Sequence, residues 1–258
     1  MNSWGATFLA VAAALTLLLP RRLALLPLLM SAAYMTSGQA LHLLDANFTL
    51  PRLLVAAGLL RVLLRQEHLP QGLQPLDRLL LAWGALLLGM SVFHEHDGWL
   101  FRSGIVWGEL GAYFLMRIFL RDVDDVRQVF RALCVLMVPL AALMVLEKLT
   151  GDNPFQVLGG VKVVTRDGAV RAGGPFNHPI LAGTAGAALL GMAWALRQSH
   201  RLAAVCGAAA GLAMVLASKS SGPVLMAACF LLAVAAEVVD VVVQKTRTPS
   251  RRGSPYWG

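Results

Sequence analysis

The chain is short of charge. Asp, Glu, Lys and Arg make up 14% of its 258 residues, whereas hydrophobic residues make up 57%. A soluble domain of this size normally carries about 25% charged residues. Apolar runs of about 18 or more residues, each typical of a membrane-spanning helix, recur along the sequence. The composition excludes an ordinary soluble domain and predicts an all-α, polytopic transmembrane helix bundle.

Cysteine and acidic residues are also scarce. The three cysteines, Cys134, Cys206 and Cys229, all fall in apolar runs, where we expect small buried hydrophobic residues and not a disulfide or a metal site. Lys and Arg outnumber Asp and Glu by 22 to 14, which gives a net charge of +8. In a membrane protein this excess marks cytoplasmic loops, so no nucleic-acid partner is predicted. No basic segment precedes the first apolar run, which argues against a cleavable signal peptide.

The hydrophobic pattern predicts about nine spans, of which the first two are short for a bilayer that needs about 20 residues per helix. The spans are 4–19, 23–36, 50–64, 79–93, 103–120, 132–147, 179–196, 202–217 and 222–243. Basic residues concentrate after the first, third, fifth, seventh and ninth spans. The positive-inside rule therefore places these loops in the cytoplasm, the N-terminus outside and the C-terminus inside. Residues 1–244 form the expected bundle, with an extended outer loop at 148–179 and a disordered basic cytoplasmic tail at 245–258.

Further structural predictions concern the amphipathic, small-residue and histidine-containing segments of the chain. The segment 121–131 is amphipathic at helical spacing and fits either a short interfacial helix or a solvated connector. Alanine- and glycine-rich stretches at 181–195 and 203–217 invite close helix packing, within one chain or between two. In the outer loop 93–98, His94, Glu95, His96 and Asp97 permit a metal site, although an interfacial polar loop is favoured because no further strong ligands lie nearby.

The most informative stretch is R-D-G-A-V-R-A-G-G-P-F-N-H-P-I-L-A-G, at 166–183. This stretch is positively charged, although the positive-inside rule expects few Lys and Arg residues on the outer side of the membrane. This exception indicates that the positive charge has a function. The β-prone V-K-V-V-T before it and the turn at Asp167-Gly168 predict a small hairpin, with Arg166 at the turn and Arg171 on the returning arm. Pro179 is predicted to begin the next helix.

This loop has the chemistry of an anion site. Two arginines can hold a pyrophosphate through paired hydrogen bonds, and the backbone N–H groups of Gly173 and Gly174 and of the helix start add a favourable field. His178, at the helix entrance, can donate a hydrogen bond or relay a proton. The alternatives are a loop that binds lipid headgroups or is only solvated, and a histidine that caps the helix. Just before the loop, Glu147 and Lys148 are expected to form a local ion pair.

At these residues the chain resembles the O-antigen ligase and polymerase family of bacterial membrane glycosyltransferases. The resemblance covers about residues 140–235 and rests on three pieces in order. They are L-E-K-L-T-G-D-N-P-F at 146–155, the 166–183 stretch, and L-A-S-K-S-S-G-P at 216–223.

The resemblance implies a multi-pass protein of the bacterial inner membrane that acts on the periplasmic side. The implied reaction moves a glycan from undecaprenyl pyrophosphate to a sugar hydroxyl, without a metal, nucleotide sugar or other cofactor. Membrane lipids and other polysaccharide-assembly proteins are further expected partners. The predicted catalytic residues are Arg166, Arg171 and His178. The predicted substrate-binding residues are Lys162, Gly173, Gly174, Asn177 and Lys219.

Two features depart from the family pattern. Ser221 stands where members often have an arginine, for which Lys219 is a possible substitute. Members are also usually longer, with a second large periplasmic loop that carries a further histidine, so this chain is expected to be a short or C-terminally truncated member. The sequence leaves open an active glycosyltransferase, a non-catalytic accessory subunit of exopolysaccharide assembly or export, and an inactive truncated homologue. A transporter is disfavoured because few ionisable residues, Glu109, Glu237 and Asp240 among them, lie within the spans.

Overall fold

The structure, a computed structural model, describes residues 1–43, 46–91, 93, 96–166 and 168–247. This part of the chain is mostly helical and holds nine α-helices, two short 3-10 helices and two β-hairpins. The α-helices are α1 Ser3–Leu18, α2 Leu26–Tyr34, α3 Leu50–Arg65, α4 Pro75–Ser91, α5 His96–Phe119, α6 Val123–Thr150, α7 Pro179–Leu196, α8 Arg201–Ser218 and α9 Ser221–Arg247. The 3-10 helices are η1 Arg21–Leu23 and η2 Pro154–Leu158, and the strands are β1 Ala40–Leu43, β2 Ala46–Thr49, β3 Val164–Arg166 and β4 Ala169–Arg171.

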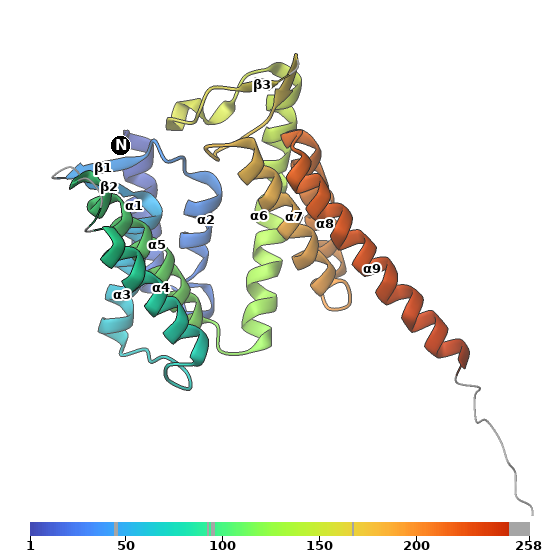
Figure 1. Cartoon of the computed structure of the whole chain (residues 1–258), viewed down its shortest axis with the longest axis horizontal. Coiled ribbons are helices and arrows are strands. Elements are labelled where there is room, and N and C mark those ends of the chain that lie inside the picture. Colours follow the sequence, from blue (N-terminus) through green and yellow to red (C-terminus); the bar gives the residue numbers. More distant parts are fainter. Residues whose placement is uncertain (44–45, 92, 94–95, 167, 248–258) are drawn as a thin grey trace, which may run out of the picture.

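The helices form two groups that lie side by side (Figure 1). In the first group, α1 packs on α3, and both α3 and α4 pack on α5. In the second, α8 packs on both α6 and α7, and α9 packs mainly on α7. Both hairpins lie at one end of the molecule, near the N-terminus, and the α3–α4, α5–α6 and α7–α8 connections lie at the other end.

Small residues explain the close packing of the second group. A side-chain carbon added at Gly186 of α7 would lie 2.7 Å from the backbone oxygen of Gly211 in α8, and one added at Gly207 would lie 2.4 Å from the sulfur of Cys134 in α6. The small-residue stretches at 181–195 and 203–217 therefore pack against each other within the chain. Cys134 is fully buried in this core, as a small apolar residue.

Four of the described helices, α6, α7, α8 and α9, are long and apolar enough to cross a membrane. The chain is therefore a multi-pass membrane protein by its helices, but the expected count of nine spans is not supported. Helix α2 has only nine residues, a length of about 13 Å. Helix α5 is long, but Arg102, Glu109 and Arg117 interrupt its apolar surface. An apolar run in the sequence shows only that a segment is hydrophobic. To cross a membrane, the segment must also form one helix that is long enough and apolar throughout.

Two other boundaries differ from the sequence predictions. The amphipathic segment 121–131 is not a separate interfacial helix, because α6 runs without a break from Val123 to Thr150 after an N-cap hydrogen bond from the Asp125 amide to Asp122. At the other end of the chain, α9 continues to Arg247, so residues 245–247 of the predicted tail are helical. The rest of that tail, 248–258, lies outside the described residues.

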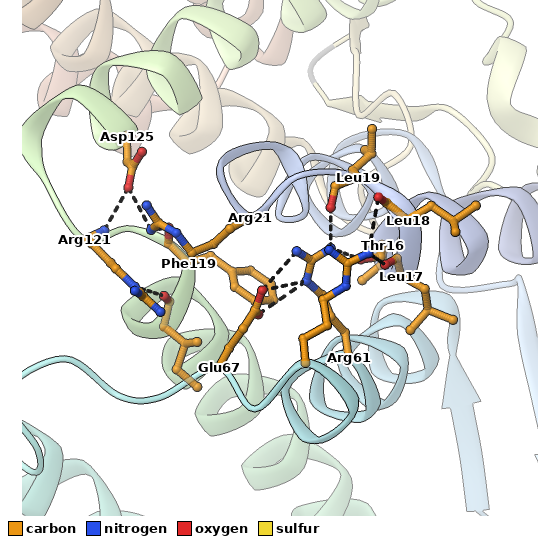
Figure 2. Close-up of polar contacts among 12 residues, drawn as sticks. Thr16, Leu17, Leu18, Leu19, Arg21, Arg61, Glu67, Phe119, Arg121 and Asp125 are labelled. Carbon is orange, nitrogen blue, oxygen red and sulfur yellow. Dashed lines mark hydrogen bonds and ion pairs between the residues drawn. The ribbon is translucent and has the colours of Figure 1, made fainter.

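The end opposite the hairpins is held by buried ion pairs (Figure 2). Arg61 of α3 is 1% exposed and pairs with Glu67 at 3.0 Å. It also donates to the carbonyl of Thr16 in α1 at 2.7 Å and to that of Leu19, the residue after α1, at 2.6 Å. A cation there satisfies carbonyls that have no partner within their own helix and complements the negative end of the helix dipole. Arg21 pairs with Asp125 at the start of α6, 2.9 Å away, and so joins the two helix groups.

A further ion pair joins α4 to α5 at the same end. Arg117 lies 2.7 Å from the carboxylate of Asp77, and the hydroxyl of Tyr113 donates to Asp77 at 2.6 Å. The Tyr113 hydrogen bond and the Arg117 charge outweigh burial and hold the pKa of Asp77 below its ordinary value. Arginines predicted to mark cytoplasmic loops thus also fix the packing of the helices.

At the opposite end, the predicted hairpin is confirmed. Strands β3 and β4 pair antiparallel with Val164 opposite Arg171 and Arg166 opposite Ala169. Arg166 is therefore the last strand residue before the turn and Arg171 lies on the returning arm, although Asp167 is outside the described residues. The β1–β2 hairpin was not predicted from the sequence.

Candidate anion-binding site

The loop between α6 and α7 is anchored at its start by local turn chemistry. Helix α6 ends at Gly151, which has a left-handed φ of 79° that favours glycine. The side chain of Asn153 then accepts from the amide of Phe155 at 2.9 Å and begins η2. The Asn153 amide nitrogen also donates to the carbonyl of Gly174, 2.9 Å away, so the first part of the loop holds the last part.

Glu147, in the last turn of α6, fixes the glycine pair. Its carboxylate is buried and accepts from the backbone N–H of Gly173 at 3.0 Å and of Gly174 at 2.8 Å. The expected ion pair with Lys148 is wrong, because Lys148 donates to the carbonyl of Leu216 in α8 instead. Successive residues of a helix point in different directions, and here one faces the loop and the other α8. The two glycine amides are therefore engaged by Glu147, in contrast to the anion-binding role expected for them.

Arg171 joins the hairpin to the α8–α9 connection. Its side chain is 8% exposed and donates from Nη2 to the hydroxyl of Ser220 at 2.6 Å, with a longer contact from Nε to the carbonyl of Ser218. The next residue, Ala172, donates its amide to the carbonyl of Ala217 at 3.1 Å. The hairpin thus lies directly against the end of α8 and the start of α9.

His178 caps α7, which begins at Pro179 as predicted. The Nδ1 atom of His178 accepts from the amide of Ile180 at 3.2 Å. Because Nδ1 accepts, the hydrogen-bond network assigns the proton of a neutral ring to Nε2. The imidazole therefore presents a donor and not a base, and the capping alternative for this histidine is the one that the structure has.

These elements surround a cleft of about 530 Å³. The hairpin contributes Arg166 and Arg171, and the start of α7 contributes His178 and Ile180. The other lining residues are Lys219 and Ser220 from the α8–α9 connection and Ser221 and Gly222 from the start of α9. No Asp or Glu is among the lining residues that the structure describes. Two helix N-termini, three cations and the hydroxyl of Ser221 converge there, and all of these groups favour a bound anion.

The cleft brings together some of the predicted site residues and separates others. Arg166, Arg171, His178 and Lys219 line it, whereas Lys162, Gly173 and Asn177 lie around a neighbouring space of about 10 Å³, too small for a ligand. Asn177 accepts a hydrogen bond from Ser37 after α2 and so belongs to a contact between the two helix groups. Gly174 has a left-handed φ of 56° and packs against Met144, which gives it a conformational role.

Sequence reasoning missed Glu147 as the support of the loop and Ser220 as the partner of Arg171. Both partners lie far along the chain from the groups they contact, 26 residues for Glu147 and Gly173 and 49 for Arg171 and Ser220. Ser221, which replaces the arginine of the family pattern, does line the cleft, beside Lys219. The described residues hold no group of three or more His, Cys, Asp or Glu arranged for a metal, and the side chains of the 94–97 segment lie outside them.

Comparisons with known proteins give no match: no protein family, no curated protein and no solved structure matches the chain.

Proposed function

We propose that this multi-pass membrane protein binds the pyrophosphate of a lipid-linked glycan in the cationic cleft. The observation that carries the proposal is the convergence of Arg166, Arg171 and Lys219 on one cleft, in which the described lining residues include no carboxylate. The cleft lies at the hairpin end of four apolar helices, where the headgroup of a membrane-embedded carrier lipid would be within reach. Its charge and hydroxyl groups suit a phosphate better than a neutral sugar.

In the reaction implied by the O-antigen ligase and polymerase resemblance, an acceptor sugar hydroxyl attacks the anomeric carbon, the bond to the pyrophosphate breaks, and the hydroxyl proton is released to water. Negative charge then grows on the departing pyrophosphate. Arg166, Arg171 and Lys219 stabilise this charge electrostatically, and His178 donates from Nε2. With the N-terminus outside, the cleft faces the periplasm and the basic loops face the cytoplasm.

The resemblance is tested by glycan transfer in membranes that contain a lipid-linked donor and a lipid A-core acceptor. Replacing Arg166 or Lys219, both exposed side chains, with glutamine removes one cation without disturbing the core. We expect each change to lower transfer at least about tenfold, because a hydrogen bond to a charged group contributes about 1.5–3 kcal/mol. Arg131→Gln and Arg201→Gln, exposed at the opposite end, are the matched controls and should leave transfer unchanged. Equal effects of all four changes would exclude a specific role for the cleft.

A second function is favoured by one observation, the lack of a base among the described residues of the cleft. Within the described residues, its lining has no carboxylate, and His178 presents a donor. A chain of this kind would bind the carrier lipid as an accessory subunit and leave proton removal to a partner protein. Purified wild-type protein that binds undecaprenyl pyrophosphate and transfers no glycan alone would favour the accessory role, and transfer by the purified chain would exclude it.

A further inference from the structure

A second cleft lies in the first helix group, away from the hairpin β3–β4. It has a volume of about 290 Å³ and lies between α2, the start of α3, and α5. Most of its lining is apolar, with Leu28, Ala32, Val55 and Met116 among its members. Two charged residues of opposite sign, Arg52 and Glu109, also line it.

Arg52 is held across the surface of α5. A side-chain carbon added at Gly104 would lie 2.5 Å from its Nη1 atom, so only glycine leaves room for the guanidinium there. The same nitrogen donates to the carbonyl of Asn47 at 2.8 Å, and the indole of Trp107 donates to the backbone oxygen of Arg52 at 3.1 Å. The position of this cation is therefore fixed by the fold.

Glu109 lies in the middle of α5 and its side chain is exposed to the cleft. Across the part of the chain that the structure describes, it makes no hydrogen bond or ion pair, and in particular none with Arg52. A carboxylate among apolar side chains needs a partner, and opposite charges attract strongly where water is scarce. The cleft thus offers a ligand one cation, which is held by Asn47, and one carboxylate that has no partner among the described residues.

The helix group that holds this cleft also exposes large apolar side chains. They lie on α3, α4 and α5, and Leu60, Leu63, Leu86 and Phe101 are among them. Such an extensive exposed apolar surface indicates contact with the hydrocarbon of a membrane. A ligand that fills the cleft from this side must carry an apolar portion to match its lining.

We propose that this cleft binds a zwitterionic phospholipid with a primary amine, such as phosphatidylethanolamine. Its phosphate pairs with Arg52, its ammonium group with Glu109, and an acyl chain lies along the apolar lining. The two clefts share no lining residue, so lipid binding here is independent of glycan binding in the cationic cleft.

The test is native mass spectrometry of the purified, delipidated full chain with three phospholipids of identical acyl chains. Their headgroups are phosphoethanolamine, phosphocholine, in which methyl groups block the ammonium hydrogen bonds, and phosphoglycerol, which lacks the cation. We expect wild type to prefer the phosphoethanolamine lipid over each of the others by about tenfold or more, the effect of one charge-assisted hydrogen bond. Glu109→Gln should remove this preference, and Arg52→Gln should weaken binding of all three lipids.

Asp124→Asn, a carboxylate 78% exposed at the start of α6, is the matched control and should leave the preference intact. Equal binding of the three lipids by wild type would overturn the proposal, as would a preference that survives Glu109→Gln. Free phosphoethanolamine that binds as tightly as the lipid would overturn the lipid assignment, since the apolar lining would then contribute nothing. Lys219→Gln serves to separate the two sites: it should weaken pyrophosphate binding and leave lipid selectivity unchanged.

Discussion

Replacing Glu147 with glutamine tests whether this carboxylate organises the functional loop. The carboxylate accepts from two backbone N–H groups, those of Gly173 and Gly174, at 3.0 and 2.8 Å. Glutamine has nearly the same shape but only one acceptor oxygen, so its NH₂ group would face the second N–H as another donor. One charge-assisted hydrogen bond is lost and one buried amide is left without a partner, a local cost of about 2–4 kcal/mol.

The assay is hydrogen exchange of the purified chain, followed on peptides that contain residues 172–175. A local cost of this size should speed exchange of the two amides by roughly 30- to 1,000-fold, because about 1.4 kcal/mol corresponds to a factor of ten. Glu237→Gln is the matched control, since Glu237 is 51% exposed and pairs with Arg197 on the membrane-facing helices. Unchanged exchange in Glu147→Gln would refute the inference that Glu147 holds the loop.

Three further predictions concern stability and are checked by thermal unfolding in detergent. Gly174→Ala places a side chain at a left-handed φ of 56° and should lower the free energy of unfolding by about 1–3 kcal/mol. An unchanged unfolding temperature would show that the loop adapts to the new side chain without strain. Arg61→Met removes a cation that is 1% exposed and should cost about 3–5 kcal/mol. Arg65 also donates to an α1 carbonyl, that of Leu17, but from an exposed side chain, so Arg65→Met should cost far less; equal losses would contradict the inference that burial makes the Arg61 contacts important. The hydrogen bond from Tyr113 lowers the pKa of Asp77 in the folded state. The ionised carboxylate therefore contributes fully to the free energy of unfolding above the pKa of about 3.9 that it has in the unfolded chain, and this contribution is lost as the pH falls through the lower pKa of the folded state. Asp77→Asn should therefore flatten the acid limb of the stability curve, and an unchanged acid limb would exclude this residue as its source.

The parts of the site that the sequence predicted correctly are those set by local chemistry. The β-prone run and the turn signal after it predicted the β3–β4 hairpin, and Pro179 begins α7. These outcomes depend on a few neighbouring residues, whose backbone preferences act over short distances. Local reasoning also placed Arg166 and Arg171 on the two arms.

The features that the sequence did not reveal depend on contacts between distant segments. Glu147 was expected to pair with its neighbour Lys148, yet its partners are glycine amides 26 and 27 residues away. The count of nine spans failed because helix length is decided by where packing and caps end each helix, as at Tyr34. Hydropathy alone could not separate short buried helices from helices that cross a membrane.

The most direct test of the central claim is the affinity of the purified chain for undecaprenyl pyrophosphate, measured beside undecaprenol, which lacks the anion. The account predicts that wild type binds the pyrophosphate more tightly, that Arg166→Gln and Lys219→Gln each weaken this binding about tenfold or more, and that Arg131→Gln does not. Equal affinity for the two lipids, or equal affinity of wild type and the cleft variants for the pyrophosphate, would contradict it.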